Sequence, residues 1–164
     1  MKDFDWTSFT KRIAVKANLT NVYNAWTCSG DVERWFLEKA EFYTNKNELL
    51  ASNEQVSKGC SYKWYWYLYP DPMPGTIKEA NGKDFIQFTF EGECLVDINL
   101  IEQNGYTIIE LKHHNIPTDD NAKKYVRLGC SNGWAFYLTN LKSVYEGGID
   151  LRNKDKNLTV MINN

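Results

Sequence analysis

Residues 61–69 read Ser-Tyr-Lys-Trp-Tyr-Trp-Tyr-Leu-Tyr, an almost unbroken aromatic run. Successive side chains of a β-strand point to opposite faces, and the one charged residue, Lys63, should face water. The inner face of this strand would then consist of Tyr62, Trp64, Trp66 and Leu68. Side chains this large fill wide spaces or line pockets, so the stretch predicts a broad interior.

The opposite face of the same strand would carry Tyr65, Tyr67 and Tyr69. A row of exposed aromatic side chains can form an oligomer or partner surface. The alternative, which we favour, is that neighbouring loops cover these rings or that they are simply exposed.

The residues after the aromatic run predict an antiparallel meander. Three prolines and Gly75 indicate a turn, and strands are expected over 75–80, 85–90, 94–103 and 106–115. Asn81-Gly82 and Asn104-Gly105 are typical of tight hairpin turns. Alternation assigns an inner, concave, apolar face to Ile86, Phe88, Phe90, Val96, Ile98, Leu100, Ile109, Leu111 and His113.

The residues before the aromatic run predict two strands and two short helices. Alternating residues 9–17 indicate a first strand, and residues 40–44 a second. Between them, Thr20 should cap a helix that ends at Trp26. A second short helix should begin at Asp31 and end at Trp35-Phe36. Polar residues 45–59 indicate a loop or a loosely joined strand pair.

A long helix is expected from Asp119 or Asp120 to about Tyr145. Trp134, Leu138, Leu141 and Tyr145 would form one apolar stripe on it, a natural cover for the concave face. Gly129 and Gly133 interrupt this helix and could mark a kink or a close approach to the sheet. The whole pattern predicts an α+β fold with one domain over residues 1–152. Residues 153–164 would be a tail, with an added edge strand at 158–162.

Composition and charge exclude several classes of function. The net charge is −2 and Lys and Arg are scattered, which argues against nucleic acid as a partner. No apolar leader and no run of about 18 apolar residues occur, so we expect a cytoplasmic chain without a transmembrane helix. The four cysteines show no CxxC spacing, so we expect reduced thiols and neither metal nor cofactor.

Several short motifs occur in a fixed order over residues 9–152. They are Leu19-Thr20-Asn21-Val22-Tyr23-Asn24-Ala25-Trp26-Thr27, Trp35-Phe36, Gly59, Gly75, Leu111-Lys112-His113, Gly133-Trp134, Leu138, Leu141 and Gly148-Ile149-Asp150-Leu151-Arg152. Their order resembles the START-like (SRPBCC, helix-grip) superfamily. Within it, they are most similar to homologues of the C-terminal domain of the heat-shock protein 90 ATPase activator, and the last motif looks like the end of bacterial members.

This resemblance implies a helix-grip fold, in which about six or seven antiparallel strands wrap around a long C-terminal helix, with two small helices after the first strand. The superfamily includes proteins that bind lipids or hydrophobic ligands, co-chaperones, and polyketide cyclases and aromatases. Fold alone does not choose among these functions.

Our first hypothesis is a non-enzymatic binder of a hydrophobic small molecule or lipid, in a cavity between sheet and helix. The second is a protein-interaction module of the co-chaperone or stress-response type, and the third is a cyclase-like enzyme. The chain would be a monomer or a homodimer. The residues expected to bind the ligand are Trp35, Tyr62, Trp64, Trp66, Phe88, Phe90, Ile98, Leu100, Leu111, His113, Trp134 and Leu138.

His113 is the one titratable residue that the pattern places firmly inside. A catalytic acid or base is one interpretation. We favour the other, a core histidine that is hydrogen-bonded to a backbone or hydroxyl group. Since His114 should face outward, the two histidines cannot form one metal site from a straight strand.

Overall fold

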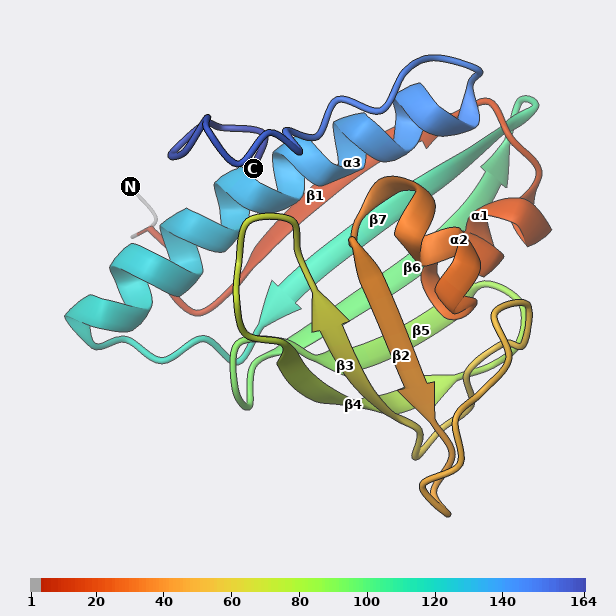
Figure 1. Cartoon of the computed structure of the whole chain (residues 1–164), viewed down its shortest axis with the longest axis horizontal. Coiled ribbons are helices and arrows are strands. Elements are labelled where there is room, and N and C mark those ends of the chain that lie inside the picture. Colours follow the sequence, from red (N-terminus) through yellow and green to blue (C-terminus); the bar gives the residue numbers. More distant parts are fainter. Residues whose placement is uncertain (1–3) are drawn as a thin grey trace.

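The computed structural model describes residues 4–164 and confirms the helix-grip prediction. Seven antiparallel strands form one curved sheet in the order β1-β7-β6-β5-β4-β3-β2, and the long C-terminal helix lies across it (Figure 1). The strands are β1 Phe9–Val15, β2 Lys39–Tyr43, β3 Ser61–Tyr65, β4 Met73–Ala80, β5 Phe85–Thr89, β6 Leu95–Gln103 and β7 Tyr106–His114. The helical elements are α1 Leu19–Thr27, α2 Ser29–Trp35, η1 Ala122–Cys130 and α3 Ser131–Tyr145.

The register of the sheet follows the predicted alternation. Strands β6 and β7 pair over nine residues, from Leu95↔His114 to Gln103↔Tyr106, and the hairpin between them turns at Asn104-Gly105. Both turn residues have positive φ, which explains the Asn-Gly sequence there. The inner face that was predicted for β5, β6 and β7 is buried throughout.

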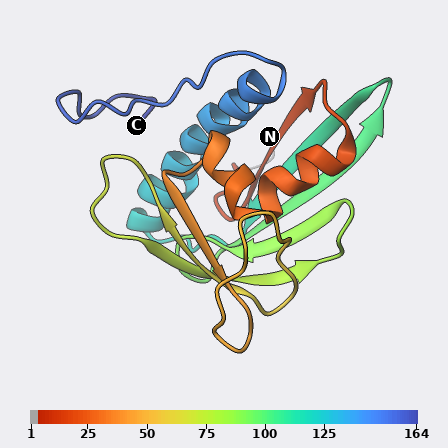
Figure 2. The same cartoon turned by 45° about the vertical axis from the view of Figure 1, so that its right-hand side comes forward.

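The two small helices sit inside the curve of the sheet, beside α3 (Figure 2). Two predicted helix starts are wrong. Asn18, not Thr20, caps α1, since its Oδ1 accepts a hydrogen bond from Asn21 N at 2.8 Å. Helix α2 begins at Ser29, so that Asp31 lies in its first turn rather than at its cap.

The C-terminal helix is not uniform. Its first nine residues, η1, form a π-helix, which the sequence did not predict. The change to α-helix occurs at Ser131, between Gly129 and Gly133. The expected close approach to the sheet is wrong for Gly133, because a Cβ added there would meet nothing within 4 Å. A π-helical segment widens a helix locally and is often found at functional sites.

The tail after α3 runs back along the outside of the helix (Figure 1). The edge strand expected at 158–162 does not form, and these residues adopt turns instead. Asn153 closes the tail on itself, because its Nδ2 donates to Leu158 O at 2.6 Å and its N donates to Asn163 O at 2.6 Å. The first of these bonds occupies the Leu158 carbonyl, which an edge strand would have offered to a neighbouring strand.

Candidate functional site

The interior around Trp64 is filled with aromatic rings. Trp64 stacks on Tyr62 with ring centroids 3.9 Å apart and meets Phe88 edge-on at 5.2 Å. The Tyr62 hydroxyl donates a hydrogen bond to Thr89 O, and burial raises its pKa. Side chains therefore occupy the space under the middle of the sheet.

Nine of the twelve predicted site residues are buried and line neither of the hollows described below. They are Trp35, Tyr62, Trp64, Phe88, Ile98, Leu100, Leu111, His113 and Leu138. The remaining three, Trp66, Phe90 and Trp134, line a hollow at one end of the core. Eleven of the twelve side chains, all but Trp66, are thus less than one tenth exposed, and three of the twelve border the hollow.

This hollow, the inner hollow, has a volume of about 230 Å³ and lies where η1 meets α3. Six aromatic side chains surround it, together with one carboxylate, one thiol and two glycines. Its lining residues are Phe36, Trp66, Phe90, Glu91, Tyr125, Gly129, Cys130, Gly133, Trp134 and Tyr137. The two glycines that the sequence singled out therefore border open space rather than the sheet.

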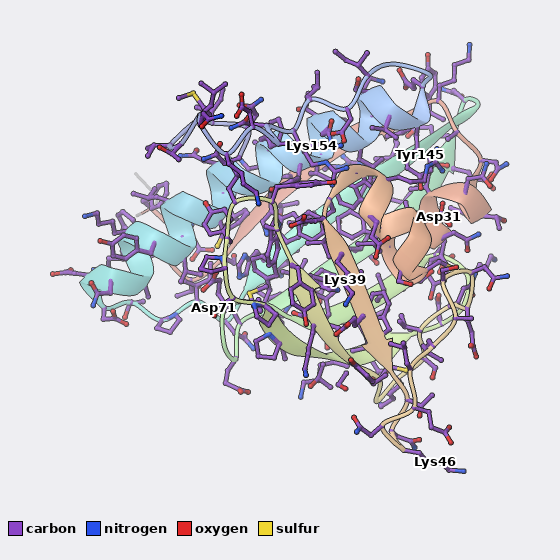
Figure 3. The ribbon with its side chains drawn as sticks, in the orientation of Figure 1. Asp31, Lys39, Lys46, Asp71, Tyr145 and Lys154 are labelled. Carbon is purple, nitrogen blue, oxygen red and sulfur yellow. The ribbon has the colours of Figure 1, made fainter. Side chains whose placement is uncertain are left out.

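A second hollow of about 580 Å³, the outer hollow, adjoins the first and shares five of its residues. The β3–β4 loop and the C-terminal tail form its other walls. Its lining residues are Trp66, Tyr69, Asp71, Pro72, Met73, Pro74, Phe90, Glu91, Gly133, Tyr137, Met161, Ile162 and Asn164. We call the two hollows together the junction pocket. Figure 3 labels Asp71 on the loop below the C-terminal helix.

The early end of β3 explains why Trp66 faces the pocket. The strand pairs no further than Tyr65, although the aromatic alternation continues to Tyr69. Leu68 adopts a left-handed conformation with φ of 69°, so it does not continue the inner face as predicted. The loop that results carries Trp66 past the core and along the pocket wall, while Tyr69 stays exposed.

Tyr65 and Tyr67, on the predicted outer face, are partly covered by polar neighbours. The Tyr65 hydroxyl donates a hydrogen bond to Glu41, and the Arg152 guanidinium lies 5.3 Å from the Tyr67 ring centroid. Tyr69 is 59% exposed. The three rings therefore do not form one continuous exposed row.

The turn after β5 supplies the pocket's carboxylate. Glu91 has a φ of 55°, a left-handed conformation that is uncommon for a residue other than glycine or asparagine. Gly92 also has positive φ, and Phe90 N donates to Cys94 O at 2.9 Å to close the turn. This turn holds Glu91 at the rim shared by both hollows.

His113 lies inside, as predicted, but the hydrogen-bonded interpretation is wrong. Its side chain is fully buried between Phe9 and Phe90, and neither ring nitrogen has a hydrogen-bond partner within residues 4–164. The pKa of His113 is lowered to about 4, chiefly by burial and to a smaller extent by the nearby charges of His114 and Arg127. The imidazole is therefore neutral at pH 7.

A buried polar network fixes the end of the domain, and the sequence did not reveal it. Asn140 Nδ2 donates to Trp35 O at 2.7 Å, and Asn140 Oδ1 accepts from Leu151 N at 2.7 Å. Arg152 donates to the carbonyls of Glu33, Arg34 and Leu37 at the end of α2.

Asp150 completes this network by pairing with Arg152 at 2.7 Å. Burial would raise the pKa of Asp150, but hydrogen bonds from Arg152 and Lys154 outweigh burial and hold the pKa well below its usual range. The network therefore links α2, α3 and residues 150–152, and its side chains line neither hollow.

Two structural features are absent from residues 4–164. No group of three or more His, Cys, Asp or Glu side chains is arranged to hold a metal ion. None of the described helices has the length and apolar character that crossing a membrane requires. Cys130 lines the inner hollow, where burial, Glu91 and Cys94 raise its pKa to about 12, so it is a neutral thiol.

The fold and the pocket between sheet and helix define a helix-grip protein of the α+β class. Residues 16–146 match the family model described as Activator of Hsp90 ATPase homolog 1-like protein, so the chain belongs to this family. A search of curated proteins found no match.

Solved structures share the fold at low sequence identity. Protein SSP2350 from Staphylococcus saprophyticus is 17% identical with a TM-score of 0.70, over 88% of this chain and 96% of that one. The Aha1 dimer from Colwellia psychrerythraea is 17% identical with a TM-score of 0.67, over 86% and 97%. CalU16 from Micromonospora echinospora is 19% identical with a TM-score of 0.62, over 88% and 77%.

Proposed function

We propose that this protein binds a hydrophobic small molecule or lipid in the junction pocket, without catalysing a reaction on it. The observation that carries the proposal is the lining of the inner hollow, where Phe36, Trp66, Phe90, Trp134 and Tyr137 surround a space at the helix junction. Ligand pockets are mostly apolar, with a few polar groups that fix orientation. Here Glu91 and Tyr125 at the rim would serve as those groups.

The outer hollow would take the remainder of the ligand. Its volume falls within the range of about 300–1,000 Å³ that is usual for small-molecule sites, and Pro72, Met73, Met161 and Ile162 add apolar surface. Of the residues predicted from sequence, Trp66, Phe90 and Trp134 would contact the ligand directly. The other nine would support these rings from behind.

A blocking substitution tests this proposal. Gly133→Leu places a side chain into the pocket, because the space around Gly133 is empty to 4 Å. Ala135→Leu is the matched control, since Ala135 is exposed on the same helix and lines neither hollow. We expect Gly133→Leu to weaken binding of decanol at least tenfold, by calorimetry or native mass spectrometry, and Ala135→Leu to leave it unchanged. Equal affinities for both variants and the unaltered protein would exclude this pocket.

A second candidate function is a protein-interaction module of the co-chaperone type. It is favoured by membership of a family named for an activator of the Hsp90 ATPase, and by the exposed apolar side chains of Val160 and Ile162 in the tail. A pull-down with the full chain, repeated with both residues changed to Ser, tests this function. Recovery of the same chaperone by both forms would exclude the tail as the contact.

A cyclase-like activity would need a polar pair beside His113. His113 has no hydrogen-bond partner within the described residues and lines neither hollow, which argues against this third function.

We further propose a cytoplasmic protein that is a monomer or a homodimer. The homodimer should be tested first, because one similar solved structure is described as an Aha1 dimer. Light scattering on the purified chain distinguishes the two.

A further inference from the structure

The junction pocket combines aromatic faces with negative charge and has no cationic lining residue. Glu91 borders both hollows, and Asp71 borders the outer one. Neither carboxylate forms an ion pair with any part of the chain between residues 4 and 164. Lys124 lies 4.9 Å from the Tyr125 ring centroid but lines neither hollow.

The rings around the inner hollow are set at steep angles to one another. Trp66 and Tyr137 stand nearly perpendicular to Phe36, at 86° and 83°, with centroids 5.4 and 4.9 Å away. Trp134 stacks on Phe36 at 5.2 Å and lies 4.9 Å from Phe90. These rings, in several planes, line one space, and we call them the aromatic cage because aromatic rings around a space can hold a cation.

The charge of Glu91 reaches into the cage. The pKa of the Cys130 thiol is raised first by burial and then by Glu91, so the carboxylate acts on a group in the wall of the inner hollow. The left-handed backbone at Glu91 also favours Gly or Asn over Glu. The chain nevertheless carries a carboxylate at this rim position.

We propose that the junction pocket selects a hydrophobic cation of the alkylammonium class, with its ammonium group in the aromatic cage beside Glu91 and its apolar chain in the outer hollow. This inference rests on the proposed function, because it specifies the ligand of the same pocket. Aromatic faces carry a negative quadrupole, which attracts cations, and the two carboxylates add to that potential. The same potential disfavours a fatty acid, whose carboxylate would find no cation in the wall.

Three ligands that share a ten-carbon chain test the selection. Decyltrimethylammonium, decanol and decanoate differ in the charge of the head group. We expect the cation to bind about tenfold more tightly than decanol in calorimetry at low salt, and decanoate to bind most weakly. Binding of decanol or decanoate as tightly as the cation would overturn the inference and leave the proposed function standing. Binding of none of the three would overturn both.

Two neighbouring glutamates of one turn provide matched variants. Glu91→Gln should reduce the affinity for decyltrimethylammonium about fivefold and leave that for decanol unchanged. Glu93→Gln removes the same charge from the same exposed turn, but Glu93 lines neither hollow, so both affinities should stay unchanged. An equal loss of affinity for decyltrimethylammonium in the two variants would mean that only the net charge of the protein matters. That result would contradict the inference.

The ammonium group could belong to a free amphiphile or to a lipid head group. Competition of bound decyltrimethylammonium by phosphatidylcholine vesicles, but not by phosphatidylglycerol vesicles, would support the lipid source. Absence of competition by either, with the free cation bound, would support the free amphiphile. Equal competition by both kinds of vesicle would contradict recognition of an ammonium group.

Discussion

Trp64 and Trp66 are two positions apart in one aromatic stretch, yet they lie in opposite surroundings. Trp64 is 2% exposed, pairs with Met73 across the β3–β4 ladder and stacks on Tyr62. Trp66 comes just after the end of β3 and lines both hollows. The same alternation thus supplies a closed core at one position and a pocket wall at the other. The difference arises where the ladder stops.

Replacing each of the two tryptophans with Ala should give the largest difference in stability between the core and the pocket. Trp64→Ala should lower the free energy of unfolding by about 4 kcal/mol, because it opens a cavity among packed rings. Trp66→Ala should lower it by about 1 kcal/mol, since that ring is already partly exposed, but should reduce ligand binding. Urea unfolding monitored by circular dichroism measures both. Equal losses of stability would contradict the contrast.

The pH dependence of stability reports on the closed core, through the buried His113. His113 has a pKa of about 4 in the folded state, against about 6.5 when unfolded. The unfolded chain therefore binds a proton first as the pH falls, and stability decreases from about pH 6.5 down to about pH 4. The contribution of this group is about 3 kcal/mol over that window.

His113→Leu should remove this contribution, so that the variant loses less stability than the unaltered protein between pH 7 and pH 4. His114→Gln is the comparison variant and should change the slope much less than His113→Leu does, because the buried imidazole remains and His114 is only a smaller cause of its lowered pKa. Urea unfolding at a series of pH values measures the difference. An unchanged slope in His113→Leu would mean that His113 is not held neutral by burial.

Two glycines provide a smaller contrast with opposite signs. A Cβ at Gly75 would lie 2.1 Å from the Tyr62 ring, so that ring must move. Gly75→Ala should therefore lower the free energy of unfolding by about 2 kcal/mol. Gly133→Ala places a methyl group in open space within α3 and should stabilise the protein by about 1 kcal/mol. Thermal unfolding measures both changes. Destabilisation by Gly133→Ala would show that there is no open space beside Gly133.

Most of the fold was predictable because it depends on local patterns. Period-two alternation predicted the inner faces of β5, β6 and β7, and Asn104-Gly105 predicted the tight turn between β6 and β7. The turn predicted at Asn81-Gly82 is instead a longer loop between Ala80 and Phe85. The end of β3 at Tyr65 was not predictable. The aromatic alternation continues beyond it, and the strand ends where its pairing with β2 and β4 ends. The buried network of Asn140 was hidden because its neighbours Leu138 and Leu141 form an ordinary apolar stripe.

The site was predictable only in part. Sequence patterning identified the aromatic residues that face inward, but not how much space their packing would leave. The π-helical turns of η1 and the left-handed Glu91 have no signal in alternation or composition. Gly129 and Gly133 were the useful signal, because residues without a side chain in a helix leave room beside it.

The indole N–H signals of the six tryptophans provide the most direct test of the central claim, that ligand binds at the Trp66 end of the aromatic interior. In a nitrogen–proton NMR titration with decyltrimethylammonium, we expect large shifts for Trp66 and Trp134, which line the inner hollow. The signals of Trp26, Trp35 and Trp64 should change little, since these rings line neither hollow. Large shifts of the Trp64 and Trp35 signals with an unchanged Trp66 signal would contradict binding at the Trp66 end.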